Sequence, residues 1–364
     1  MKKKMALLAG LLVGMATMTA SANPYAIYSE IESGSLQERT GSLFQSEETA
    51  DGVSVWGRYL GGKVRQNSGT HTLFAPSTIK ATYSGIQVGM DKKINEKVRI
   101  GGFVGYTDYN VDYVTNGDAD IHSTHVGIYG IYKKPETGFY LDGTFKVGSL
   151  KQNQNFRWDP QTYPVMGQTL NNDVHLNDSD RSSNWSLSVG AGQKVYLNDK
   201  EQKKEGFYVE PRANVMVGRV SGSSYKDTFT NSVTVPVLGA RPVAGELEVE
   251  YGNTDIGLLN LGTLIGYEVK SGKNPVNVYG KVAFIRDFGD EMTMNGKGTA
   301  TAMGMPVTIA QSVETNQKNH WWVFGLGVSG QIKERHNLYL DLETTAGSDI
   351  DKNWQLSGGY RFSW

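Results

Sequence analysis

The sequence of 364 residues predicts an all-β protein, a twelve-stranded antiparallel transmembrane β-barrel. Three observations lead to this fold class. Apolar and polar residues alternate with a period of two in twelve runs, and this period places successive side chains on opposite faces of a strand. The connections between the runs alternate between short and mostly long ones. The last run ends the chain on an aromatic residue.

The first 22 residues have the pattern of a secretory signal peptide. Three lysines at 2–4 precede an apolar stretch at 5–19, and Ala20-Ser21-Ala22 matches the small-residue cleavage pattern. A membrane-spanning helix needs roughly 20 apolar residues, so an N-terminal membrane anchor is the less favoured alternative. We therefore expect Sec-type export and cleavage near Ala22.

Each run in the rest of the chain has the alternation and length of a membrane-spanning strand. In 338–343, leucines at every second position share one face, while Asp341 and Glu343 share the other face with Tyr339. A tilted strand of about ten residues is long enough to cross a bilayer. The predicted strands lie at 52–64, 81–93, 98–109, 120–133, 139–156, 184–197, 207–220, 253–268, 276–288, 320–332, 338–346 and 354–364.

The connections differ between the two ends of the strands. Short turns lie at 95–97, 134–137, 274–275 and 333–336, and longer polar loops lie at 65–80, 110–119, 157–183, 221–252 and 289–319. Short turns at one end and long loops at the other are typical of outer-membrane barrels, whose turns are periplasmic. A soluble β-sandwich is the alternative, but it has no need of strands long enough to span a membrane.

Glycine and aromatic residues support the barrel. Glycine accounts for 44 of the 364 residues, and glycine inside a strand fits where the sheet bends or another group approaches closely. We expect the curvature of the barrel and a body inside the pore to provide these conditions. Aromatic residues near strand ends predict girdles at the membrane interfaces. They are Trp56 and Tyr59, Tyr106 and Tyr109, Tyr129 and Tyr132, Trp321 and Trp322, and Tyr360, Phe362 and Trp364.

The last strand resembles the C-terminal recognition strand of bacterial outer-membrane proteins. Alternate residues of 354–364 form an apolar face that ends on Trp364. The residues of the expected assembly signal are Ser357, Gly359, Tyr360, Phe362 and Trp364. The resemblance implies recognition by the barrel-assembly machinery through strand pairing. It also implies periplasmic chaperones as partners and outer-membrane lipid of a Gram-negative-type bacterium as the surroundings.

Several segments resemble the translocator β-barrel domain of type V autotransporters: 55–61, 138–143, 206–212 and the closing hairpin module 321–364, which contains 338–343. The resemblance covers the chain from about residue 25 to the end. It implies a twelve-stranded barrel with a helix through its pore, and an N-terminal passenger exported to the cell surface. Residues 23–51 then correspond to the linker and pore helix, with a helix expected within 25–48, and residues 52–364 correspond to the barrel.

The sequence departs from this family in the segment that precedes the barrel. Only the 29 residues 23–51 separate the expected cleavage site from the first strand. The pair Asn171-Asn172 lies in a loop, whereas some relatives cut their passenger at such a pair ahead of the barrel. We therefore expect a membrane-embedded translocator or pore-type structural protein with little or no passenger. The alternative is a surface adhesin that acts through the loops 157–183, 221–252 and 289–319.

Charged residues on the polar faces of the strands predict a lumen that is balanced in charge. The inward set contains four acids and four bases: Asp142, Lys146, Glu210, Arg212, Lys281, Asp341, Glu343 and Arg361. A selective ion channel would show rings of one sign. We therefore expect these side chains to pair with each other and to hold a plug.

The sequence gives little support for an enzyme. It has no cysteine, and it has no G-x-S-x-G or H-E-x-x-H motif. His122 and His125 are three apart on a strand, so they point to opposite faces and do not chelate together. Acidic pairs such as Asp287 with Asp290 are the basis of a less favoured alternative, a hydrolase at the outer rim.

Partners follow from the same reasoning. The net charge of −1 gives no general attraction for nucleic acid, so we expect no nucleic-acid partner. We expect no catalytic, cofactor-binding or metal site. Besides the assembly partners, we expect a host or cell-surface ligand for the long loops.

Overall fold

A computed structural model describes residues 31–32, 52–67, 78–113, 117–157, 161–165, 168–172, 175–197, 205–235, 239–271, 274–290, 292–302, 305–315, 320–333, 335–347 and 350–364. These residues are nearly all in β-strands. None of the described helical residues form a helix long and apolar enough to cross a membrane.

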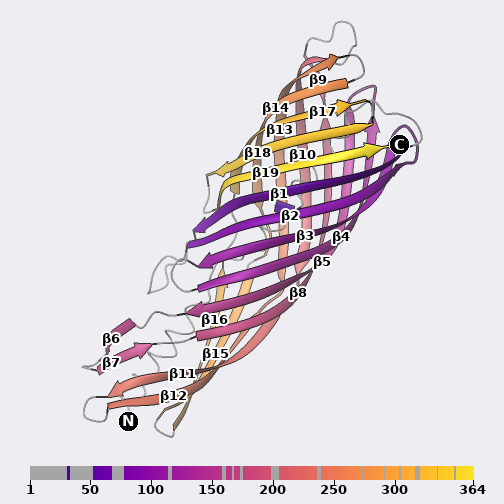
Figure 1. Ribbon diagram of the computed structural model, residues 1–364. Helices are drawn as coiled ribbons and strands as arrows, with labels where there is room; N and C mark the ends of the chain where they lie inside the picture. Colours follow the sequence, from indigo (N-terminus) through magenta and orange to yellow (C-terminus); the bar gives the residue numbers. More distant parts are fainter. Residues whose placement is uncertain are drawn as a thin grey trace.

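Twelve antiparallel strands form a closed barrel (Figure 1). The first strand pairs with the last, which closes the sheet, and β10 pairs with β13 across the longest connection. The short strand β9 (Val195–Tyr196) adds to the edge of β10. The barrel strands are β1 (Val53–Asn67), β2 (Thr78–Lys93), β3 (Val98–Tyr113), β4 (Gly117–Lys134), β5 (Phe139–Arg157), β8 (His175–Gln193), β10 (Gly206–Val220), β13 (Thr254–Ser271), β14 (Asn274–Asp287), β17 (His320–Ile332), β18 (His336–Ala346) and β19 (Ile350–Ser363). The predicted twelve-stranded antiparallel barrel is confirmed.

A second sheet of six strands lies beyond the barrel, at the end away from the C-terminus (Figure 1). Its strands, in spatial order, are β16 (Met305–Thr315), β15 (Met292–Ala302), β12 (Gly239–Tyr251), β11 (Ser223–Val235), β7 (Gln168–Asn172) and β6 (Gln161–Val165).

This sheet corrects the prediction that 157–183, 221–252 and 289–319 are loops. In the segment 223–235 one face is entirely polar, and the other mixes apolar residues with Asp227 and Asn231, so the alternation of apolar and polar residues that marks a half-buried strand is interrupted. These strands form because hairpin partners satisfy their backbone hydrogen-bonding groups, for example β12 beside β11.

The outer face of the barrel carries an apolar belt and the inner face is polar. In β18, Leu338, Leu340 and Leu342 are exposed on the outside, whereas Tyr339 and Asp341 are buried inside. The belt ends toward the loops where polar side chains replace apolar ones on the outer face. At that level Asp108, His122 and Lys151 lie opposite each other on β3, β4 and β5.

The predicted aromatic girdles are wrong for one member of each of four pairs. Tyr59, Tyr106, Tyr132 and Trp322 are exposed on the outer face, but their partners Trp56, Tyr109, Tyr129 and Trp321 are buried on the inner face. The members of each pair are one or three residues apart, and a strand places residues at odd separations on opposite faces. The inner aromatics therefore fill the lumen, and only the outer ones contact the membrane interface.

Inward-facing glycines give room to aromatic rings on the neighbouring strand. A side-chain carbon built on Gly101 would lie 2.6 Å from a ring carbon of Tyr129, its direct partner across the strands. The prediction explained glycines inside strands by the curvature of the barrel and by a body in the pore. The close contact here is instead with an aromatic ring of the wall itself. Pairs of this kind are Gly62–Tyr83, Gly89–Trp56, Gly101–Tyr129, Gly127–Phe103, Gly192–Tyr140, Gly266–Tyr208, Gly327–Tyr279 and Gly359–Tyr339.

Candidate functional site

The lumen of the barrel holds a piece of the chain's own N-terminal segment. Ile31 and Glu32 have helical backbone, and their exposed fractions are only 1% and 2%. Ile31 belongs to a cluster of buried apolar residues that line the wall, including Leu60 and Tyr83. The rest of the predicted helix within 25–48 lies outside the described residues.

Glu32 is held by polar side chains from three strands. Lys146 on β5 donates from Nζ to Glu32 Oε2 at 2.6 Å, and the Tyr109 hydroxyl on β3 donates to Oε1 at 3.1 Å. Arg58 on β1 donates from Nη2 to the backbone carbonyl of Glu32 at 2.9 Å. A buried carboxylate is costly unless it is paired and hydrogen-bonded, and all these partners satisfy Glu32.

A second layer of hydrogen bonds fixes this arrangement. Arg58 Nε donates to Gln87 Oε1 at 2.9 Å, and the side-chain amide of Gln87 lies 2.8 Å from Nε2 of His125. His125 Nδ1 in turn lies 3.5 Å from Glu32 Oε2. The ring of interactions runs through β1, β2 and β4, so the carboxylate contacts a preformed polar pocket in the wall.

Four of the charges predicted to face the lumen pair with neighbours on the inner wall. Arg212 donates to Glu210 Oε1 at 2.6 Å, and the Tyr140 hydroxyl donates to the same oxygen at 2.9 Å. Lys281 pairs with Glu343 on β18. The acids and bases thus neutralise each other locally along this side of the lumen.

The other four predicted charges also lie on the inner face. Lys146 is the partner of Glu32, and Asp341 accepts a hydrogen bond from the Tyr279 hydroxyl. Asp142 is buried at 8% exposure. Arg361 donates to Asp91 Oδ1 at 2.7 Å. The structure therefore distributes the eight side chains among several networks and does not gather them into one site.

The network around Arg361 spans the line where the barrel closes. Arg361 on β19 reaches across β1 to Asp91 on β2, and Arg99 on β3 donates to the same carboxylate oxygen at 2.5 Å. Arg361 also donates to the Ser54 hydroxyl at 2.9 Å. The hydroxyl oxygens of Ser54 and Ser363 lie 2.9 Å apart. Four strands are therefore joined by side chains as well as by backbone pairing.

Sequence reasoning missed several inward groups. Arg58 and Asp91 lie on the inner faces of predicted strands, so their position in the alternation was enough to find them. Lys194 and Glu268 form a buried ion pair. Both lie within predicted strands, and Lys194 continues the inward parity of β8, so the alternation was enough to find them too. Glu32 had no usable signal, because its contacts come from strands more than 25 residues away along the chain.

The two histidines considered for metal binding are not brought together. His122 lies on the outer face, 2.5 Å from Asp108, whereas His125 is buried inside. Asp287 is buried and accepts a hydrogen bond from the amide of Gly289. In the described part of the chain, no group of three or more His, Cys, Asp or Glu residues could hold a metal ion.

These features define the class of the protein. A closed barrel with an apolar outer belt and a polar lumen is an integral outer-membrane β-barrel, and part of the chain's own N-terminal segment lies inside this one. The chain belongs to the autotransporter β-domain family, because the model of the family described as "Autotransporter beta-domain" matches residues 55–343.

Relatives of known name agree with this assignment. The chain is 27% identical over 340 residues to "Probable autotransporter YcgV" of Escherichia coli K12, and the matched region covers 92% of this chain and 30% of that protein. It is 28% identical over 360 residues to "BrkA autotransporter" of Bordetella pertussis, and the matched region covers 97% of this chain and 30% of that protein. The chain therefore spans about 30% of the length of these curated relatives.

Solved structures share the fold. The beta domain of the Bordetella autotransporter BrkA has a TM-score of 0.59 at 21% identity, over 86% of this chain and 100% of that one. The translocator domain of NalP from Neisseria meningitidis has a TM-score of 0.57 at 13% identity, over 94% and 100%. The chain is thus an autotransporter translocator barrel of the Gram-negative outer membrane. Such barrels are assembled by the outer-membrane machinery and are not typically catalytic.

Proposed function

We propose that this barrel is a membrane-embedded translocator whose pore is closed by its own N-terminal segment, 23–51. The contact of Glu32 with Lys146 and Tyr109 carries the proposal, because it anchors this segment to the wall of the lumen. Among the described residues, the charges of the inner wall pair locally and form no ring of one sign that would select ions.

Conductance across a planar bilayer tests the proposal. The wild-type barrel should conduct little, and Glu32→Ala should raise the open probability because Lys146 and Tyr109 lose the carboxylate that they bind. Deletion of 23–50 should raise conductance further. Glu246→Ala, on the second sheet and exposed, is a matched control that should leave conductance unchanged. Equal conductance in the wild type, Glu32→Ala and the deletion would refute closure by this segment.

A second candidate function is adhesion through the six-stranded sheet. One observation favours it: the strands β11, β12, β15 and β16 extend as paired hairpins beyond the barrel and form a continuous surface. Ordered strands supply a more rigid contact surface than loops do. Replacement of the β15–β16 hairpin, 292–315, by a short turn should abolish binding of cells to host or neighbouring cells, with conductance intact. Unchanged binding would remove the adhesin from consideration.

A further inference from the structure

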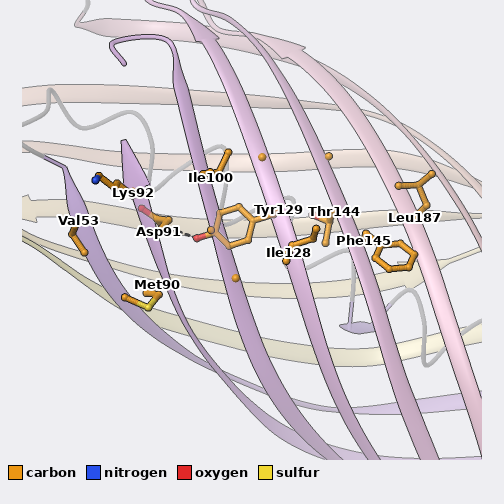
Figure 2. A pocket seen from close by; sticks show the side chains of 14 residues that line it. Val53, Met90, Asp91, Lys92, Ile100, Ile128, Tyr129, Thr144, Phe145 and Leu187 are labelled. Atoms are coloured by element: carbon orange, nitrogen blue, oxygen red, sulfur yellow. Dashed lines mark hydrogen bonds between the residues drawn. The ribbon is translucent and has the colours of Figure 1, made fainter. Parts of the chain in front are cut away.

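A groove of about 770 Å³ lies on the outer, lipid-facing wall of the barrel, across β2, β3, β4, β5 and β8 (Figure 2). Its floor contains Gly102, Gly130 and Gly143, which all lie on the outer face. Gly130 stands directly opposite Gly143 on the neighbouring strand. Two adjacent positions in the wall therefore lack side chains, and the apolar belt has a depression here.

Large apolar side chains form one wall of the groove. Met90, Gly102, Ile128, Phe145 and Leu187 follow one another across five strands in register. The four large side chains of this row are between 42% and 64% exposed. Figure 2 shows Ile128, Phe145 and Leu187 projecting along this row. The groove offers more contact to a flexible hydrocarbon chain than a flat apolar belt does.

The groove is closed toward the lumen. On the inner side of the wall, the ring of Tyr129 covers Gly101, and the Tyr129 hydroxyl donates to Asp91 Oδ2 at 2.6 Å (Figure 2). A molecule in the groove is therefore reached from the bilayer and not from the pore.

Positive charge borders the groove at its turn end. Lys92 lines the groove and is exposed, next to Ile100 in register. On β4, exposed Tyr132 and then exposed Lys134 follow Gly130 on the same face. An aromatic residue followed by lysine marks the interface of a membrane. The exposed charged residues of this rim are Lys92, Lys97 and Lys134 with Glu96 and Glu136, whereas Lys93 and Lys133 have the inner-face parity of their strands. The rim therefore has an excess of one positive charge.

We propose that this groove binds one anionic phospholipid of the periplasmic leaflet. Its acyl chains lie over the three glycines against the row of Ile128 and Phe145. Its phosphate lies at the rim, between Lys92 and Lys134. The charge of the rim favours an anionic headgroup over a zwitterionic one. The location of the groove, beside short turns that are periplasmic in this fold, selects the inner leaflet.

Native mass spectrometry of the full chain in detergent tests the proposal with phosphatidylglycerol and phosphatidylethanolamine as probes. The wild type should retain one phosphatidylglycerol in preference to phosphatidylethanolamine. Lys92→Gln and Lys134→Gln should each weaken the binding of phosphatidylglycerol about fivefold. They should leave phosphatidylethanolamine unaffected. Lys333→Gln, on an exposed turn outside the groove, is the matched control and should bind as the wild type does.

A second set of variants fills the groove without disturbing the wall. A side-chain carbon on Gly130 or Gly143 would meet no atom closer than 3.9 and 3.8 Å, respectively. Gly130→Val with Gly143→Val should therefore fold, as shown by a heat-dependent shift in gel mobility, and should lose both lipids. Gly280→Val, whose nearest atom is also at 3.8 Å, lies on the outer face of β14, outside this groove, and is the control.

Three results would overturn the proposal. The first is equal retention of the two lipids by the wild type. The second is an unchanged preference when both lysines are replaced. The third is the retention of phosphatidylglycerol by the folded, filled variant. Dimers of the wild type that disappear when the groove is filled would identify a second copy of the chain as the occupant instead.

Discussion

Replacement of Gly101 by alanine tests how tightly the inner wall is packed. The new methyl carbon would lie 2.6 Å from Asp91 Cβ, from the Met90 carbonyl oxygen and from a ring carbon of Tyr129. Two of these neighbours cannot move without a shift of the strand, so the Tyr129 ring must be displaced and the backbone must adjust.

The magnitude follows from what Tyr129 does in the wall. Overpacking costs about 1–3 kcal/mol. Tyr129 also accepts a hydrogen bond from Trp56 Nε1 at 2.8 Å and donates one to Asp91 at 2.6 Å, and each is worth about 0.5–1.5 kcal/mol. Gly101→Ala should therefore lower the free energy of unfolding by about 1–6 kcal/mol, with the upper value reached if both hydrogen bonds are lost.

Gly280→Ala is the matched control, because its new carbon meets nothing closer than 3.8 Å. It should raise the free energy of unfolding by about 0.4–1 kcal/mol, since alanine restricts the unfolded chain. The assay is the guanidinium midpoint of the barrel in detergent, with folded and unfolded forms separated by their gel mobility. Equal midpoints for Gly101→Ala and Gly280→Ala would show that the contact between glycine and ring has no energetic role.

Three further predictions concern the seam, the last strand and the leader. Arg361→Gln should lower the free energy of unfolding by about 1.5–3 kcal/mol, because Asp91 loses one charged hydrogen-bond partner; a guanidinium midpoint equal to that of the wild type contradicts this. Removal of the side chains of Phe362 and Trp364 by alanine substitution should abolish insertion into the outer membrane, and a normal surface yield would refute the assembly signal. N-terminal sequencing of the exported protein should give Asn23 as the first residue, and an uncleaved Met1 would disprove the signal peptide.

Strand periodicity explains both the successes and the failures of the sequence-based prediction. It identified twelve strands because each barrel strand has lipid on one side and the lumen on the other, so one face must be apolar. The prediction failed for Trp56 and Trp321. It placed them at the membrane interface because they lie near strand ends, but an odd or even position along the strand decides which face a residue occupies. It failed also for 223–235, because Asp227 and Asn231 interrupt the apolar face of this strand, so its alternation is incomplete.

Contacts that join distant parts of the chain were beyond the reach of the sequence. The pairing of Glu32 with Lys146 spans 114 residues, and that of Arg361 with Asp91 spans 270. No local pattern encodes the partner of a buried charge, because the partner is selected by the register and closure of the sheet.

The sequence by itself determined the barrel, its strand number and the two chemically different faces, because the alternation of side chains is a local property of each strand. The tertiary structure alone decided which charges meet, which glycines lie beneath aromatic rings and which leave an open groove. Gly101 and Gly130 illustrate the difference. Both are glycines inside strands, but the register of β3 against β4 puts the ring of Tyr129 over Gly101, whereas the register of β4 against β5 puts Gly143 beside Gly130 and leaves both open to the bilayer.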